Sequence, residues 1–552
     1  MGKNDDDDRT PTTSRRGFLK AAGFTAAGVG VGGIAGGIAG YNAGIGADQS
    51  DPALDPESRP GFEHVVVFMG ENRSFDNMLG WLYERGDLPD GETFEGLTTG
   101  DYANRAPDGT RIPAHTYTGA TDLIMRSPDP DPGEEYPHVN TQLFGTIDPP
   151  ENGTLEVGQM QPPFNAPKKG AKPTMDGFVR DYISDYHGRR GVDPDPQQLD
   201  VIMGGFSPQM LPVLSKLAKE FAVYDHWHAA VPSQTFCNRS FFHASTSHGF
   251  VTNQYGGGYA KWLDAGASPT VFNRLEDKNV TWRVYFDALQ LVSYTGVLHA
   301  PVLEKYWRTE RFATMEQFYD DVANGTLPAY AFIEPRLVFN HNDFHPPVGP
   351  YRSTEVDGVD IIDSAESDVR AGELLVHEIY SAIKASSSKT GSHALNTLLL
   401  ITFDEHGGTY DHVPPPDATP PDDSGPGEMG FTFDRLGVRV PAIAVSAYTR
   451  KGTIIHEQMD HGSVIATLSR LHGLVPLTKR DEASNTLFNV VNLQTPRHPS
   501  TWPETTPQYN PPNPEAVPPH PVHGNNDKPL SPPGRGLLGL LIAKYDPGAK
   551  QP

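Results

Sequence analysis

The chain has 552 residues, of which 37% are hydrophobic, so it is long enough to bury a real core as one large α/β domain or two ordinary ones. Its 69 acidic residues outnumber the 44 Lys and Arg, and the net charge of −25 argues against broad electrostatic binding of nucleic acid or of an anionic membrane. The one cysteine, Cys237, excludes an intrachain disulfide.

The N-terminus has the pattern of an export signal. Arg15 and Arg16 precede Phe18 and Leu19, and a weakly apolar run rich in Gly and Ala follows to about residue 40. We assign residues 1–47 to a twin-arginine signal peptide, which is a receptor-read address and not part of the fold. A retained anchor helix is the alternative, although spanning helices are usually more apolar. The pattern predicts the twin-arginine translocation machinery as a partner and an extracellular or cell-envelope location.

Residues 48–494 alternate short apolar runs with helix-like segments, which predicts one α/β domain with a largely parallel, buried sheet. We predict strands at 64–69, 221–225, 281–286, 330–334, 397–403 and 440–448. We predict helices at 207–221, 368–386 and 462–474. In such a sheet, ligands bind beyond the carboxyl ends of the strands.

Two segments are less regular. Residues 87–175 are rich in Gly, Pro and Asp, which predicts long surface loops that cap one edge of the sheet. Residues 495–552 form a proline-rich C-terminal arm. The arm ends in an apolar helix at 536–545, which we expect to dock on the body of the protein, with contact to a membrane as the alternative.

Polar side chains follow two of the predicted strands. Glu71 and Asn72 come after the first strand, and Asp404 and Glu405 come after the strand at 397–403. Three gathered carboxylates repel one another unless a cation lies between them, so the pattern predicts one divalent metal ion. Oxygen ligands favour Mg, Ca or Mn, and nearby histidines would also admit Zn. The alternative is that Glu71 and Asp404 cap helices after their strands.

Thr235 precedes a helix that we predict to begin near Phe236, so its hydroxyl is expected at the N-cap, where backbone N–H groups favour anions. A hydroxyl in contact with a metal can attack phosphorus. Asn238 and Arg239, one turn further on, are candidates to hold phosphoryl oxygens. An ordinary helix cap is the alternative, and Cys237 is a rival nucleophile that has no evident base partner.

Several histidines stand beside these segments. His345 lies in the segment 334–347, and His461 lies next to the predicted helix start at 462. Histidine is a natural general acid near neutral pH, although each could be a structural loop residue. Gly407 and Gly408 permit a tight turn, which we expect to bring His412 back over the site.

The order of these motifs resembles a known family. The motifs are ENRSFDNMLG (71–80), PSQTFCNR (232–239), NDFHPP (342–347), DEHGGTYDHVPPP (404–416) and DHGSV (460–464). In this order they resemble the bacterial phosphoesterase family, which contains the phosphatidylcholine-type phospholipases C, their plant non-specific relatives and an acid phosphatase branch. The resemblance implies an alkaline-phosphatase-like three-layer α/β/α sandwich and a metal-assisted mechanism with a covalent phospho-enzyme.

The resemblance also implies roles for the residues at the matching positions. Glu71, Asn72, Asp404 and Glu405 would be metal ligands, and Thr235 would complete the metal shell as the nucleophile. His345 and His412 would act at the phosphate or the leaving group, with His461 nearby. Two positions depart from the family pattern. Cys237 stands where proline is common, and Glu134 stands where a histidine is often expected, so that His138 is the candidate substitute.

The sequence therefore predicts an exported, metal-dependent phosphoric-ester hydrolase whose substrate is a phosphate ester, with a phospholipid favoured, and which does not bind nucleic acid. The activity expected first is that of a phospholipase C, and an acid phosphatase acting on monoesters is the alternative. A non-catalytic exported binding protein on the same scaffold is a second alternative. The identity of the metal, the oligomeric state and the cleavage of the signal stay open.

Overall fold

The computed structural model describes residues 60–118, 124–290, 292–337, 341–347, 352–356, 359–363, 368–508 and 532–545. The predicted signal peptide at 1–47 and much of the C-terminal arm lie outside these ranges. Among the helices that are described, none is long and apolar enough to cross a membrane.

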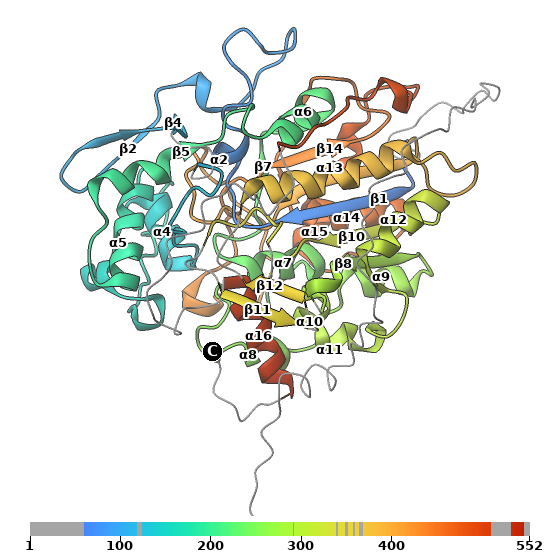
Figure 1. The fold of residues 1–552 in the computed structure, drawn as a ribbon. Coiled ribbons are helices and arrows are strands. Elements are labelled where there is room, and N and C mark those ends of the chain that lie inside the picture. Colours follow the sequence, from blue (N-terminus) through green and yellow to red (C-terminus); the bar gives the residue numbers. More distant parts are fainter. Residues whose placement is uncertain are drawn as a thin grey trace, which may run out of the picture. The chain divides into compact units, whose positions relative to one another are not determined.

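An eight-stranded sheet forms the centre of the domain (Figure 1). Its strands follow the order β15-β6-β14-β13-β1-β10-β8-β9. Their bounds are β1 (His64–Gly70), β6 (Ala222–Tyr224), β8 (Trp282–Phe286), β9 (Phe312–Thr314), β10 (Tyr330–Glu334), β13 (Thr397–Phe403), β14 (Ala442–Val445) and β15 (Thr453–Ile455). In the described part of this sheet only β14 runs antiparallel to its neighbours, so the prediction of a largely parallel sheet is confirmed.

Helices cover both faces of the sheet, which makes three layers (Figure 1). Trp282 and Tyr285 of β8 are three residues apart and therefore point to opposite faces. Phe272 packs on Trp282 with 4.7 Å between ring centroids, and Phe318 packs on Tyr285 at 5.3 Å. One layer holds α7 (Thr235–Ala244), α9 (Val271–Asp277) and α14 (Gly462–His472). The other holds α6 (Pro212–Glu220), α12 (Met315–Asn324) and α13 (Val369–Ala385).

The predicted strands and helices are all present, with ends that differ by a few residues. The largest difference is at 207–221, where α6 begins only at Pro212 because proline suits the first turn of a helix. The shorter helices are α2 (Phe75–Leu79), α8 (Ala260–Asp264), α10 (Tyr294–Leu298), α11 (Ala300–Leu303) and α15 (Lys479–Ala483). The short strands are β2 (Ala103–Arg105), β3 (Arg111–Pro113), β4 (His115–Thr116), β5 (Gly204–Gly205), β7 (Trp227–His228), β11 (Arg352–Val356), β12 (Val359–Asp363) and β16 (Met459–Asp460).

The segment 87–175 is more ordered than the expected surface loops. It contains α4 (Tyr136–Phe144), which packs with α5 (Phe178–Arg190) around a buried apolar cluster of their own. The pair Val139 and Leu143 lies four residues apart on one face of α4, and both are fully buried. The helix ends at Gly145 in the left-handed conformation, a common way to terminate a helix.

The C-terminal helix α16 (Pro532–Tyr545) packs against the body, as predicted for the apolar segment 536–545. Leu540 is fully buried in this contact. Gly539 lies so close to Tyr259 that a Cβ atom there would come within 2.0 Å of the tyrosine ring. Glycine at this position is what allows the close approach of α16.

Candidate active site

The pairing of β1 with β13 brings the two predicted metal-binding segments together. These strands are parallel neighbours, and their register sets Gly70 opposite Phe403. Each strand is followed at once by an acidic residue, Glu71 after β1 and Asp404 after β13. Because parallel neighbours end at the same edge of a sheet, both carboxylates emerge side by side, and both are fully buried.

Helix α7 adds a hydroxyl and a guanidinium to these carboxylates. The hydroxyl of Thr235 donates a hydrogen bond to Glu71 Oε2 at 3.3 Å. Arg239, one turn further along α7, donates from Nε to Glu71 Oε1 at 2.8 Å, and the same nitrogen lies 3.4 Å from Asp404 Oδ2. The predicted nucleophile therefore sits among two of the predicted ligands and one arginine.

The expected N-cap position of Thr235 is wrong by one residue. Gln234 is the N-cap of α7, and Thr235 is the first residue of the helix. Gln234 keeps an extended backbone, and its side-chain oxygen accepts a hydrogen bond from the N–H of Asn253 at 2.7 Å. The chain therefore turns into the helix only at Thr235, whose hydroxyl is directed to Glu71 and does not cap the helix.

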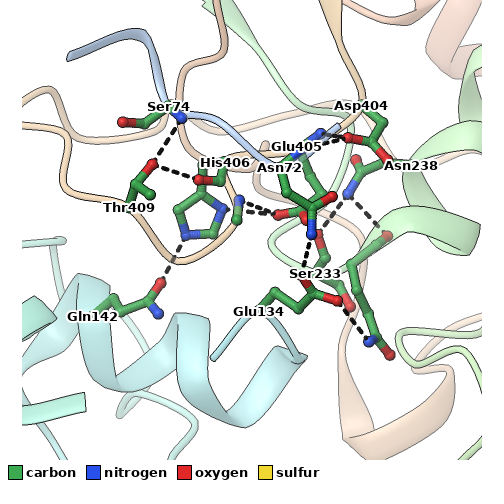
Figure 2. Close-up of polar contacts among 12 residues, drawn as sticks. Asn72, Ser74, Glu134, Gln142, Ser233, Asn238, Asp404, Glu405, His406 and Thr409 are labelled. Atoms are coloured by element: carbon green, nitrogen blue, oxygen red, sulfur yellow. Dashed lines mark hydrogen bonds and ion pairs between the residues drawn. The ribbon is translucent and has the colours of Figure 1, made fainter. Parts of the chain in front are cut away.

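The turn after β13 is tied to the turn after β1. Asp404 Oδ1 accepts hydrogen bonds from the N–H of Asn72 at 3.1 Å and from the N–H of Glu405 at 2.8 Å (Figure 2). Gly407 has φ +58°, and a Cβ there would lie 2.2 Å from the carbonyl oxygen of Asn72. The tight turn predicted from the glycine pair is present, and glycine is required at its first position.

The helix-capping alternative for the two acids does not hold. Ser74 is the N-cap of α2, and its hydroxyl accepts a hydrogen bond from the N–H of Asn77. Asp404 is followed by a turn and not by a helix. Neither Glu71 nor Asp404 is needed to begin a helix, so their burial at the strand ends calls for another explanation.

Three buried oxygen atoms at the predicted ligands accept no hydrogen bond in the described part of the chain: Asn72 Oδ1, Asp404 Oδ2 and Glu405 Oε1. Buried polar atoms are almost always partnered, so such a group points to a missing ligand. Burial raises the pKa of Glu405 well above its ordinary value, and the neighbouring charge of Asp404 raises it further. These oxygen donors fit a hard divalent cation, which would stabilise the carboxylates in their charged form.

The most closely spaced groups of possible metal-binding atoms are not the predicted ligands. Within the described residues, two sets of three His, Cys, Asp or Glu side chains bring their ligand atoms within 4.8 Å of one another. They are Asp131 with Glu134 and His345, and Asp76 with Asp411 and His412. The predicted set is looser, and Arg239 lies against two of its carboxylates. The metal-binding role of Glu71, Asn72, Thr235, Asp404 and Glu405 therefore stays a prediction.

His345 and Glu134 meet at Asn72. The side-chain nitrogen of Asn72 donates to the carboxylate of Glu134 (Figure 2). It also donates to His345 Nε2 at 3.0 Å. His345 Nδ1 donates to the carbonyl of Pro346 at 2.6 Å. Burial lowers the pKa of His345 to about 4, which keeps the ring neutral with a lone pair on Nε2. The residue that departs from the family pattern, Glu134, therefore lies directly beside the predicted site.

His461 holds the backbone of Asp404 through a hydrogen bond. It stands at the start of α14, and its Nε2 donates to the carbonyl oxygen of Asp404 at 2.6 Å. Its Nδ1 accepts a hydrogen bond from Trp227 at 3.4 Å. Burial lowers the pKa of His461 to about 4. Both ring nitrogens are thus occupied by the protein, so His461 positions Asp404, and its contact with substrate stays a prediction.

The two residues expected to hold phosphoryl oxygens have other partners. The amide of Asn238 bonds to the backbone of the turn before α7, accepting from Val231 N at 3.0 Å and donating to Ser233 O at 2.6 Å (Figure 2). It braces the loop that carries Thr235. Arg239 is paired with Glu71 as described above, although its Nη1 has no hydrogen-bond partner among the described residues.

The rival nucleophile Cys237 is fully buried. Burial raises the pKa of its thiol well above the ordinary value, which disfavours the reactive thiolate. The packing role considered from the sequence is therefore favoured over the nucleophilic one.

His412 does not return over the site as predicted. Its Nδ1 bonds to Asp76 at 2.6 Å and its Nε2 to Glu95 at 3.2 Å. Burial works against a charged ring, but Asp76 outweighs it, so the pKa of His412 is raised. Arg439 is bound to Asp76 and to Asp411 at 3.0 Å each. The turn therefore carries His412 into a second polar cluster, where carboxylates and an arginine hold it.

His138 is also directed away from the site. Its Nδ1 bonds to Asp181 of α5 at 2.9 Å, and its Nε2 lies 3.6 Å from Asp185. Burial lowers the pKa of His138, but Asp181 outweighs burial and raises it to about 9. His138 joins α4 to α5, and Glu134, not the candidate substitute His138, lies beside Asn72.

Asp131 was not anticipated from the sequence as a site residue. It belongs to the run DPDPGEE, which resembles an exposed acidic loop in a segment rich in Gly and Pro. In the structure Asp131 is 2% exposed and Glu134 is 3% exposed. The departure from the family pattern at Glu134 was the one sequence signal that pointed to this loop.

Comparisons with known proteins agree with the motifs. Residues 62–475 match the Phosphoesterase family. The chain is 33% identical over 460 residues to non-specific phospholipase C3 of Arabidopsis thaliana, which covers 80% of this chain and 76% of that protein. It is 25% identical over 521 residues to phospholipase C B of Mycobacterium tuberculosis, covering 88% of this chain and 87% of that protein.

A solved structure of a protein in the alkaline phosphatase superfamily from Vibrio parahaemolyticus is 12% identical, covers 62% of this chain and 81% of that chain, and has a TM-score of 0.29. The α/β class rests on the sheet order described above. From the family match and the plant and bacterial relatives, this chain belongs to the Phosphoesterase family and is a hydrolase that acts on phosphoric esters.

Proposed function

We propose that the protein is an exported, metal-dependent phospholipase C-like hydrolase that acts through a phospho-threonine intermediate. The observation that carries the proposal is the hydroxyl of Thr235, which is buried at the start of α7 and donates to Glu71, next to three oxygens that accept no hydrogen bond from the described residues. The named relatives are phospholipases C, which supports a phosphodiester substrate with a lipid arm. The export part of the proposal rests on the twin arginines Arg15 and Arg16.

The chemistry begins at Thr235. Its Oγ attacks phosphorus and loses its proton to Glu71, which already accepts a hydrogen bond from it. The bond between phosphorus and the leaving oxygen breaks, and the leaving alcohol takes up the proton that Glu71 received. Water then attacks phosphorus and gives a proton to Glu71, the bond between Thr235 Oγ and phosphorus breaks, and Thr235 regains its proton from Glu71 as the phosphoryl group leaves with the oxygen of water. A divalent ion held by Asn72 and the neighbouring carboxylates would supply positive charge for the phosphoryl oxygens.

Substitution of the nucleophile tests the proposal. Thr235→Ala should lower turnover of p-nitrophenyl phosphorylcholine by at least about 10³-fold, while the melting temperature stays close to that of the wild type. Thr235→Ser keeps the hydroxyl and serves as the matched control, so it should retain measurable turnover. Wild-type turnover that survives in Thr235→Ala would refute the phospho-threonine intermediate.

The substrate class is tested in the same assay. An acid phosphatase would turn over p-nitrophenyl phosphate, a monoester, and leave the phosphorylcholine diester intact. A non-catalytic binding protein would turn over neither substrate, even after purification without chelator and with divalent metal added.

A further inference from the structure

Three side chains able to bind a metal converge next to the candidate active site. The ligand atoms of Asp131, Glu134 and His345 all lie within 4.8 Å of one another, and all three residues are buried. They come from two distant segments, the loop before α4 and the segment that follows β10. A convergence of two acids and an imidazole from separate segments is not produced by local sequence, so the tertiary structure holds it in place.

The two carboxylates of this group have no cation in direct contact among the described residues. Asp411, which is equally buried, lies 3.0 Å from Arg439. Asp131 and Glu134 form no ion pair with any described residue, and Asp131 Oδ1 accepts no hydrogen bond. Arg189 and Arg73 act on Asp131 electrostatically, but Arg189 donates to its backbone carbonyl and neither arginine pairs with the carboxylate. Two buried carboxylates with no cation in contact are costly in their charged form, and a bound cation would stabilise them.

The tautomer of His345 is the one that can bind a metal through Nε2. His345 Nδ1 is committed to the carbonyl of Pro346, so Nε2 carries the lone pair. A backbone carbonyl that orients the ring in this way is the common outer partner of a metal-binding histidine. Nε2 and the Glu134 carboxylate both accept from the side-chain nitrogen of Asn72, so a bound cation would take the place of these hydrogen bonds.

Asn72 separates this group from the predicted ligands of the first ion. Its backbone N–H donates to Asp404, whereas its side-chain nitrogen donates to Glu134 and His345. Asn72 thus belongs to the first ligand set and contacts two members of the second.

We propose that Asp131, Glu134 and His345 bind a second divalent cation, next to the one proposed at Glu71, Asn72, Asp404 and Glu405. The mixed nitrogen and oxygen ligands favour Zn²⁺ or Mn²⁺ over Ca²⁺. The inference rests on the proposed function in one respect: both ions would serve the same phosphate ester, and the second would add positive charge beside it.

Metal counting on the full chain tests the proposal. Protein stripped with chelator and dialysed against Zn²⁺ should hold about two equivalents, measured by mass spectrometry of the metal. The double variant Asp131→Asn, Glu134→Gln should hold about one, and Asp404→Asn should lose the other equivalent. Glu135→Gln removes the adjacent carboxylate, which is not in the group, and should keep both.

Thermal unfolding separates a lost site from a misfolded protein. Without metal, the double variant should melt at the same temperature as the wild type or higher, because two buried carboxylates that form no direct ion pair are replaced by neutral amides. Adding Zn²⁺ should raise its melting temperature by less than that of the wild type. Glu134→Gln alone, as a milder variant, should weaken the second equivalent at least about tenfold.

The outcomes distinguish the two proposals. A double variant that keeps both equivalents overturns the second site. A wild type that binds a single equivalent, lost in Asp404→Asn but kept in the double variant, overturns the second site and leaves the proposed function intact. A wild type that binds no metal overturns both.

Discussion

Replacement of Arg239 by glutamine tests the electrostatics of the site most directly. The guanidinium is 1% exposed and is the cation in contact with Glu71 and Asp404. Breaking a buried ion pair by removing one partner typically costs about 3–5 kcal/mol, because an uncompensated buried charge remains. We therefore expect Arg239→Gln to be among the more destabilising single substitutions in the domain.

The expected shift in melting temperature follows from the size of the chain. At about 2.1 cal/mol/K per residue, a domain of about 500 residues has an unfolding entropy of about 1 kcal/mol/K, so 3–5 kcal/mol corresponds to about 3–5 °C. The assay is calorimetric or fluorimetric melting in chelator and again with excess divalent metal. A bound cation would neutralise the same carboxylates, so metal should reduce the difference between variant and wild type.

A surface arginine provides the control. Arg450 is 61% exposed in its side chain and pairs with Glu92 at 3.0 Å, so Arg450→Gln should shift the melting temperature by less than about 1 °C. The reasoning is refuted if Arg239→Gln behaves like this control in chelator. It is also refuted if excess metal leaves the deficit of Arg239→Gln unchanged, because the cation would then not act on the same carboxylates.

Two further substitutions examine the packing around the site. His138→Gln should destabilise the protein by about 1–3 kcal/mol at pH 6, because Asp181 loses its partner. The pKa of His138 is raised to about 9, so the stabilisation from the ion pair is complete below pH 6.5 and is lost as the pH rises through 9. The melting temperatures of variant and wild type should therefore converge above that pH. A difference in melting temperature that stays constant with pH would contradict the ion pair. Gly407→Ala places a Cβ 2.2 Å from the carbonyl oxygen of Asn72 at φ +58° and should lower turnover at least about 10²-fold by moving the turn after β13. Gly109→Ala, at φ +90° with open space around it, bears only the backbone cost of about 1–2 kcal/mol, and equal activity losses in the two variants would contradict the steric argument.

The sheet could be predicted because each strand is encoded by a short apolar run of the local sequence. The run TLLLITF is apolar at consecutive positions, as a strand buried on both faces must be, and β13 has the predicted bounds 397–403. The placement of Glu71 beside Asp404 also follows from the sequence, since both come directly after such strands and parallel neighbours end at one edge. The position of Thr235 at the start of a helix followed from the same local reasoning, to within one residue.

The directions of the side chains could not be predicted in this way. His412 is nine residues beyond β13, and its orientation depends on Asp76 and Arg439, which come from other parts of the chain. The amide of Asn238 could serve a ligand or its own loop, and only the folded turn shows that it bonds to that loop.

The sequence alone determined the α/β class, the parallel strands and the family, because hydrophobic runs and short ordered motifs are properties of the chain itself. Only the tertiary structure decided that Glu134 and not His138 lies beside Asn72, and that Asp131 joins it there. The physical reason is competition among buried charges. His138 is held by two carboxylates of α5, whereas Glu134 and Asp131 face His345 and form no direct ion pair with a described residue.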